Sequence, residues 1–237
     1  MKENFIKSYP YKTELHCHTF PASGCSDLTA SELVALYKKL NVDTIVLTNH
    51  YYNRTYEDAT VLRSKEETVQ EYLQCYHELK LHGESAGISC ILGMEIRFAE
   101  NENDYLLYGI SENDVAPLFD SLDGDLERFH KNFKRKDQLL YQAHPFRNKM
   151  IPADPKYLDG IEVFNMNPGL NSRVYLAHNY ANEHHLPIIG GSDCHEVSHA
   201  GGCLLRTKEK LESSRQLVSV LKSGDYILDI AGSIILP

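Results

Sequence analysis

Short apolar runs alternate with amphipathic stretches along the whole chain. Runs rich in β-branched and aromatic residues predict strands at 13–18, 44–48, 89–96, 105–110, 138–143, 160–165, 187–189, 203–207 and 226–230. Apolar residues at helical spacing predict helices over 29–40, 64–83, most of 111–137, 172–183 and 213–223. This alternation predicts an α/β protein with a mostly parallel sheet, either a barrel or a doubly wound sheet.

Two of the expected helices begin with a capping box. Thr29 is followed by Glu32, and Ser64 by Glu67, at the spacing that lets each pair satisfy the first free N–H groups of a helix. The second helix is expected to stop near Gly83. No linker or repeat interrupts the pattern, and 237 residues suit one large domain, so we expect a single domain over 1–237.

Five histidines lie in or directly after predicted strands: His16, His18, His50, His144 and His195. Because side chains alternate along a strand, His16 and His18 should project together, and so should Asp193 and His195, with a cysteine turned away between each pair. Active groups of α/β folds gather at the carboxyl ends of strands, where most of these histidines fall. Taken singly, a histidine such as His50 or His144 is more often structural than a ligand, so the argument depends on the whole set.

Glu95 stands in the otherwise apolar stretch 93–97. A buried carboxylate without a partner costs several kcal/mol, so Glu95 should be neutral, paired or bound to a metal. Imidazoles and carboxylates together suit Zn²⁺, Mn²⁺ or Fe²⁺, and we expect two or three divalent ions. Pro145 should hold His144 in an extended conformation.

Arg147, directly after the His144-Pro145 turn, is a candidate for binding a phosphate group through its planar guanidinium. A surface salt bridge is the alternative for this side chain. Arg97 is a weaker candidate for the same role.

The composition narrows the classes of partner. A net charge of −9 argues against general binding of nucleic acid, since such binding depends on Lys and Arg neutralising phosphates. A small phosphorylated substrate remains compatible with this charge. We see neither a secretory signal nor an apolar stretch approaching a membrane span, and we expect the six cysteines to be reduced thiols in a cytoplasmic protein.

Taken in order, these segments resemble the motifs of the PHP (polymerase and histidinol phosphatase) superfamily from about residue 11 to residue 201. The segments are His16-Cys17-His18, Asn49-His50, Gly93-Met94-Glu95, His144-Pro145 and Gly191-Ser192-Asp193-Cys194-His195. The resemblance implies a distorted (β/α)₇ TIM-like barrel with two or three metals at the carboxyl ends of its strands. By position, it assigns His16, His18, Glu95 and Asp193 to one metal, Glu95 and His144 to a second, and His50 and His195 to a third.

The chain also departs from the family pattern. Asn49 stands where the family usually has Asp, and Ser23 lies near a position that is often Asp or His, so Cys25 or Asp27 is a possible substitute ligand. A histidine usual on the strand after Glu95 is absent, and Asp104 falls near its place. The segment 161–165, with Asn171 beyond it, also resembles the family, which makes Glu162 and Asn165 candidates for supporting the ligands or contacting the substrate. The remaining histidines are expected to be surface or structural residues, and His199, just past the last motif, is the one for which this expectation is weakest.

The expected activity is hydrolysis of a phosphate ester, either a small phosphomonoester such as histidinol phosphate or a nucleotide-type ester. A metal-bridging hydroxide would attack phosphorus, with Glu95, His195 and Arg147 as the catalytic set. His195 can either ligate a third metal or protonate the leaving alcohol, but not both. Two alternatives stay open: hydrolysis of an amide or lactone by the same cluster, and a catalytically weak, metal-binding regulatory domain.

Overall fold

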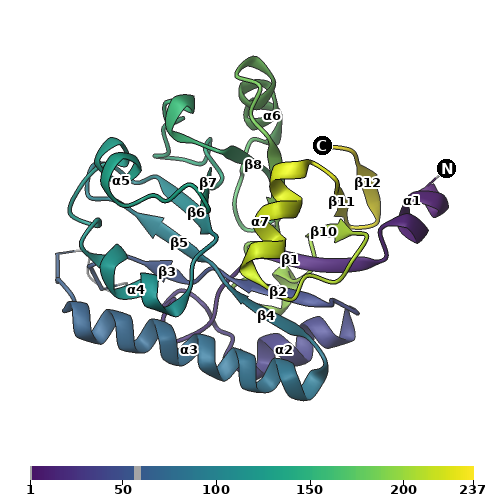
Figure 1. Ribbon diagram of the computed structural model, residues 1–237, viewed down its shortest axis with the longest axis horizontal. Helices are drawn as coiled ribbons and strands as arrows, with labels where there is room; N and C mark the ends of the chain where they lie inside the picture. Colours follow the sequence, from purple (N-terminus) through teal and green to yellow (C-terminus); the bar gives the residue numbers. More distant parts are fainter. Residues whose placement is uncertain (1, 56–59) are drawn as a thin grey trace.

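The computed structural model describes residues 2–55 and 60–237 and has the predicted α/β class (Figure 1). The helices are α1 (Lys2–Ser8), α2 (Ala30–Lys39), α3 (Lys65–Ala86), α4 (Glu112–Phe119), α5 (Leu126–Asn132), α6 (Val174–Glu183) and α7 (Ser214–Ser223). The strands are β1 (Tyr11–Cys17), β2 (Thr44–Leu47), β3 (His50–Tyr51), β4 (Ser89–Leu92), β5 (Met94–Arg97), β6 (Asp104–Tyr108), β7 (Leu139–Gln142), β8 (Gly160–Asn165), β9 (Ile188–Gly191), β10 (Cys203–Thr207), β11 (Ile227–Ile230) and β12 (Ser233–Ile235).

The strands form two six-stranded sheets. One has the order β12-β11-β10-β1-β2-β4 and the other β3-β5-β6-β7-β8-β9. The chain passes from β2 to β3 and from β4 to β5 with only a short break, and an isolated parallel bridge joins Cys17 to Cys194. The hydrogen-bonded ladders of the described residues therefore make two linked sheets, and the closed (β/α)₇ barrel stays a prediction.

The expectation of a mostly parallel arrangement is wrong. Neighbours β1–β2, β2–β4, β3–β5, β7–β8 and β8–β9 are parallel, whereas β6 is antiparallel to both β5 and β7, and β10–β12 join β1 by antiparallel pairing. The cause at β6 is its short connection, since residues 98–103 are too few for the crossover that a parallel pair requires.

Both predicted capping boxes are present, at Thr29 with Glu32 and at Ser64 with Glu67. The second helix, α3, does not stop near Gly83 as expected. It continues to Ala86 and ends on Gly87, whose φ of +74° suits a left-handed helix cap. Gly83 instead lies where α3 packs closely against β4. A Cβ at this position would come within 2.4 Å of Cys90 Sγ.

An apolar cluster beneath the carboxyl ends of the strands joins the two sheets. Leu15, Val46 and Ile91 come from one sheet and Leu106 and Ile189 from the other, and all are fully buried. Helix α7 contributes to the same cluster and crosses in front of the strands in Figure 1. No helix among the described residues is long and apolar enough to cross a bilayer.

Close packing at Gly160 gives a test of this arrangement. A Cβ at Gly160 would lie 2.1 Å from Tyr141 Cε1 and 2.5 Å from the Pro187 carbonyl oxygen, so Gly160→Ala must displace backbone as well as a side chain. We expect a loss of about 1–3 kcal/mol in the free energy of unfolding, measured by urea denaturation. Gly124→Ala is the control, since its Cβ would mainly meet the flexible side chain of Arg128, and an equal loss in both variants would contradict the packing argument.

Candidate metal centre

A bulge in β1 presents the first pair of histidines. The register between β1 and β2 gains one residue between Glu14 and Cys17, which leaves the His16 N–H outside the ladder. Glu14 Oε1 accepts this N–H at 2.9 Å and the Ser192 N–H at 3.0 Å, while the Tyr37 hydroxyl donates to Oε2 at 2.6 Å. Burial raises the pKa of Glu14. Its carboxyl group thus ties β1 to the segment after β9, a role that sequence analysis missed.

The segment after β9 lies directly against β1. The Cys194 carbonyl accepts the His18 N–H at 2.9 Å, and Cys17 and Cys194 are turned into the core, as predicted. At Gly191, a Cβ would approach His16 Cβ to 2.4 Å, so this close contact needs glycine. Asp193 follows with a φ of +49°, a backbone strain of the kind found at functional sites.

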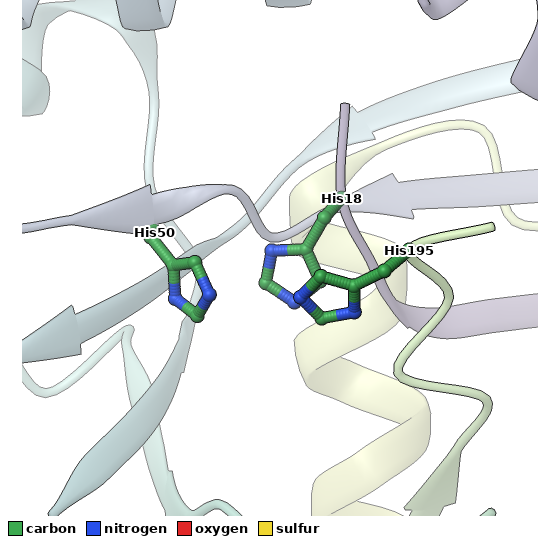
Figure 2. Close-up of side chains that lie close together, drawn as sticks. All are labelled: His18, His50 and His195. Carbon is green, nitrogen blue, oxygen red and sulfur yellow. The ribbon is translucent and has the colours of Figure 1, made fainter. Parts of the chain in front are cut away.

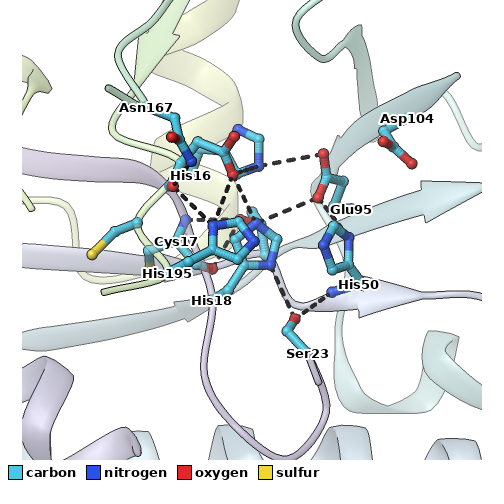
Figure 3. Close-up of polar contacts among 12 residues, drawn as sticks. His16, Cys17, His18, Ser23, His50, Glu95, Asp104, Asn167 and His195 are labelled. Atoms are coloured by element: carbon cyan, nitrogen blue, oxygen red, sulfur yellow. Dashed lines mark hydrogen bonds and ion pairs between the residues drawn. The ribbon is translucent and has the colours of Figure 1, made fainter. Parts of the chain in front are cut away.

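Glu95 lies between His50 and the group formed by His16, His18 and His195 (Figure 3). Its Oε1 is 3.4 Å from His16 Nε2 and 3.0 Å from His144 Nε2, and its Oε2 is 3.4 Å from His18 Nε2 and 2.8 Å from His50 Nδ1. Asp193 Oδ1 approaches the first pair from the other side, 3.3 Å from His16 Nε2 and 3.2 Å from His18 Nε2. The fold therefore brings together residues from four distant chain segments around one carboxylate. With His195 beside Asp193, all seven predicted ligands belong to the same cluster: His16, His18, His50, Glu95, His144, Asp193 and His195.

Hydrogen bonds fix which nitrogen of each ring faces the cluster. His16 Nδ1 bonds to Glu162 Oε1 at 2.8 Å, and His195 Nδ1 to the Asp193 carbonyl at 2.9 Å. His18 Nδ1 lies 3.0 Å from Ser23 Oγ, whose own proton is donated to Asn49 Oδ1. In each of these rings the hydrogen bond occupies Nδ1 and leaves Nε2 free, the arrangement that supporting hydrogen bonds impose on metal-binding histidines.

The donor set fits divalent ions. Buried atoms with no hydrogen-bond partner among the described residues include His16 Nε2, His18 Nε2, His50 Nδ1, His144 Nδ1 and Glu95 Oε2. Two ligand atoms that are each about 2.1 Å from one ion in a tetrahedral shell lie about 3.4 Å apart. The separations of 3.2–3.4 Å between His16 or His18 and the two carboxylates match that value.

The charge of the site also favours cations. Glu95, Asp193 and Glu162 are buried, and Arg147 is ion-paired to Asp193 at 2.6 Å. Burial raises the pKa of Asp193, but His16, His18 and Arg147 outweigh it and hold this pKa well below its usual range. Burial lowers the pKa of His16, but the three carboxylates raise it well above the ordinary histidine value. Carboxylate charge therefore dominates around the ring of His16.

The contacts that hold the histidines in place differ from the expectations at His144 and at Ser23. His144 is not extended, since its φ is +30°; its N–H instead reaches Glu162 Oε2 at 3.0 Å while its ring reaches Glu95. Glu162 thus supports two of the histidines, and Asn165 Nδ2 donates to the same Oε2. Ser23, identified only as a departure from the family, orients His18 and accepts the His50 N–H at 2.9 Å.

The three candidate substitute ligands, Asp104, Asp27 and Cys25, differ in their burial and in their hydrogen-bond partners. Asp104 is buried near Glu95 and His144, but Arg97 holds its carboxylate through two bonds of 2.7 Å. Asp27 is exposed and is in none of the potential ligand groups among the described residues. Cys25 is half-buried; burial raises its pKa, but hydrogen bonds with His195 and His50 lower it to about 6.

A cavity of about 920 Å³ opens over the cluster. Its lining includes His50, His144, Asp193 and His195, together with Arg147. The Arg147 guanidinium also bonds to Asn165, and its Nε has no hydrogen-bond partner among the described residues. Asn171 and His199 line the same cavity.

Comparison with known proteins identifies the fold. The chain is similar to a two-domain protein from Bacteroides vulgatus ATCC 8482 that contains a PHP-like metal-dependent phosphoesterase, with a TM-score of 0.63 and 18% identity over 92% of this chain and 64% of that one. It is also similar to PsfC from Pseudomonas syringae PB-5123, with a TM-score of 0.60 and 18% identity over 90% of this chain and 96% of that one. The chain has the PHP fold. A metal-dependent phosphoesterase from Bifidobacterium adolescentis ATCC 15703 shares this fold, with a TM-score of 0.51 and 17% identity over 89% of this chain and 95% of that one.

The sequence comparisons are consistent with the PHP fold. A family model described as PHP-associated matches residues 173–226, and no curated protein matches the chain. This match and the PHP-like neighbours together support the superfamily resemblance drawn from the motifs. The chain spans 64% of the Bacteroides protein, slightly under two thirds of its length.

If the cluster around Glu95 and Asp193 holds divalent ions, these ions should stabilise the folded chain. At an ion concentration 100 times the dissociation constant, binding adds about 2.7 kcal/mol, which should raise the Tm of metal-stripped protein by about 5–10 °C in a thermal-shift titration with Zn²⁺ or Mn²⁺. Asp193→Asn should lose at least half of that shift, whereas His82→Ala, an exposed histidine on α3, should keep it. Equal shifts in both variants would place the bound ion elsewhere.

Proposed function

We propose that this protein is a divalent-metal-dependent phosphoesterase acting on a small phosphate ester. The observation that carries the proposal is the convergence of Glu95 and Asp193 with unpartnered imidazole nitrogens at one side of a cavity of about 920 Å³. A cavity of this size suits a small organic ester, either a phosphomonoester such as histidinol phosphate or a nucleotide-type ester.

The proposed ligand assignments are those that the resemblance to the PHP motifs implies, applied to this cluster. His16, His18, Asp193 and Glu95 would hold one ion, Glu95 and His144 a second, and His50 and His195 a third. When bound, such ions lower the pKa of water and offset charge on phosphoryl oxygens. Zn²⁺, Mn²⁺ and Fe²⁺ all suit nitrogen and oxygen donors.

The chain's own residues orient this chemistry. Glu162 fixes the His16 ring and the backbone of His144, so these two side chains need no rearrangement when the site fills. Glu95 lies 2.8–3.4 Å from the ring nitrogens of four histidines, so its carboxylate is directed at the atoms that would bind the ions. We assign His195 as a ligand, because its Nδ1 is committed to the Asp193 carbonyl and its other nitrogen is left to bind.

Arg147 has a double role in this proposal. Its ion pair with Asp193 keeps that carboxylate aimed at His16 and His18, while its unpartnered Nε and its place in the cavity lining supply positive charge beside the bound phosphate. The guanidinium would therefore stabilise charge on the oxygens of the phosphoryl group.

The activity has a direct test. Metal-stripped protein reloaded with Mn²⁺ or Zn²⁺ should release product from an aryl phosphate or an aryl phosphodiester, and Glu95→Gln should lower kcat/KM by at least about 100-fold, since loss of a mere supporting group already costs 10- to 100-fold. Hydrolysis of an aryl amide or a lactone without any phosphate ester would replace this proposal by the alternative hydrolase. No turnover with any divalent ion would leave the metal-binding regulatory role.

Substitution of Arg147 separates its two roles. Arg147→Lys keeps the charge but loses the planar set of donors, and we expect KM for the phosphate ester to rise about 10- to 100-fold, because a hydrogen bond to a charged group contributes roughly 1.5–3 kcal/mol. Arg215→Lys, an exposed arginine on α7, is the control. Metal content should stay near that of the wild type. A loss of bound ions with unchanged KM would show that Arg147 acts only through Asp193.

A further inference from the structure

We infer that Glu14 positions the first ion, the one assigned to His16, His18, Glu95 and Asp193, an inference that rests on the proposed metal dependence. Glu14 itself is in none of the potential ligand groups among the described residues. Its carboxylate instead contacts the backbone of the two segments that carry these ligands. Glu14 is therefore a positioning residue, which would act on the ion only through the ligands that it holds in place.

One oxygen of Glu14 joins two segments that are far apart in the chain. Its Oε1 accepts the His16 N–H at 2.9 Å and the Ser192 N–H at 3.0 Å. Glu14 and Ser192 are fully buried, so water does not replace a bond that is lost here. The segment after β9 therefore cannot move away from β1 without leaving a buried N–H group unpaired.

The carboxylate is also fixed at its second oxygen. The Tyr37 hydroxyl, on α2, donates to Glu14 Oε2 at 2.6 Å, and the Tyr37 side chain is fully buried. With partners at both oxygens, the carboxylate is held in one orientation. Glu14 can therefore act as a rigid spacer between helix α2, strand β1 and the segment after β9.

The residue after Ser192 shows why this link matters. Asp193 has a φ of +49°, a left-handed conformation that a residue with a side chain keeps only where its surroundings impose it. On one side of Asp193, the Ser192 N–H is bonded to Glu14. On the other side, the Cys194 N–H donates to the His16 carbonyl at 3.3 Å. Glu14 therefore supplies the anchor on one side of this strained residue.

The conformation of Asp193 decides where its carboxylate points. Its Oδ1 lies 3.3 Å from His16 Nε2 and 3.2 Å from His18 Nε2, close to the separation of two ligand atoms on one ion. If the Ser192 anchor were lost, Asp193 could relax toward negative φ, and its carboxylate would leave this position. The first ion would then lose a ligand although no ligand had been substituted.

The residues assigned to the third ion, His50 and His195, are held by other contacts. The His18 ring centroid lies 4.1 Å from that of His195 and 4.4 Å from that of His50 (Figure 2). The His195 carbonyl accepts the Ser26 hydroxyl proton at 3.1 Å. Because none of these contacts involves Glu14, a change at Glu14 should weaken the first ion and leave the third ion in place.

Stepwise binding of Zn²⁺ to metal-stripped protein, followed by calorimetry, tests this role without measuring activity. Glu14→Met has a similar length but no acceptor. It should weaken one binding step at least about 10-fold and leave the others unchanged, because loss of a group that supports metal ligands costs roughly 10- to 100-fold in affinity. Glu14→Gln keeps an acceptor oxygen for both N–H groups and an amide that can bond to Tyr37, so binding should return to within about 3-fold of the wild type.

Two further variants identify the affected ion and exclude a general effect of stability. Asp193→Asn should weaken the same binding step. Combining it with Glu14→Met should cost less than the product of the two separate losses, because both changes act on one carboxylate. Asp43→Leu is the matched control. It removes a carboxylate that accepts the Lys12 N–H at 2.9 Å, at the other end of β1, and should leave every binding step unchanged.

Tyr37→Phe is a milder variant for the case that Glu14→Met does not fold. It removes only the bond to Glu14 Oε2 and should weaken the same binding step roughly 2- to 10-fold, as expected for loss of one hydrogen bond. Unchanged binding in all folded variants, a uniform loss at every step, or an equal loss in Asp43→Leu overturns the role of Glu14.

The outcomes also separate this inference from the proposed activity. A selective loss in Glu14→Met, in a protein whose wild type hydrolyses no phosphate ester, supports the positioning role and overturns the phosphoesterase proposal. Hydrolysis of phosphate esters together with uniform binding losses does the reverse. A wild-type protein that binds no divalent ion overturns both.

Discussion

Three carboxylates, those of Glu95, Asp193 and Glu162, are buried close together at the base of one cavity. Each buried ion costs several kcal/mol unless opposite charge or hydrogen bonds surround it, so this crowding constrains everything near it. Glu162 is satisfied by the protein alone, through His16, the His144 N–H and Asn165. Glu95 and Asp193 instead lie 3.2–3.4 Å from the Nε2 atoms of His16 and His18, which have no hydrogen-bond partner among the described residues, so this part of the cluster is suited to cations.

The two most visible departures from the PHP motifs form a single structural unit. Ser23 donates to Asn49, and Asn49 in turn accepts the Thr19 N–H at 2.6 Å and donates to the Thr19 hydroxyl at 2.9 Å. An aspartate at residue 49 would place a further negative charge here, whereas the amide both donates and accepts. The change at these positions therefore replaces charge with a hydrogen-bond chain that still orients His18.

Much of the secondary structure could be predicted because its causes are local. The strand at 160–165, the strand at 203–207 and the caps at Thr29 and Ser64 follow from side chains within a few residues of each other. The antiparallel pairing of β6 and the division into two sheets depend on partners far away in the chain, and alternation of apolar and polar residues does not specify a partner.

The candidate site shows the same division between local and distant causes. The histidines could be identified because they follow strands, and Glu95 because a carboxylate stood in an apolar run. Glu14 is also an acidic residue within a strand, but its role depends on a bulge that no pattern in β1 announces. The φ of His144 was mispredicted because a rule about the next residue, Pro145, was overridden by the pull of Glu162 on its N–H.

Because of the bulge in β1, the positions of the ligands depend more on the number of residues in this strand than on the identity of each residue. Residues 15 and 16 together oppose a single residue of β2, so that Leu15 enters the apolar cluster and His16 still points to Glu95. Deleting one residue between Glu14 and Cys17 would reverse the alternation of everything beyond it relative to the sheet. Among related chains, an insertion or deletion in this stretch would therefore remove the ligands more surely than most single substitutions of Leu15.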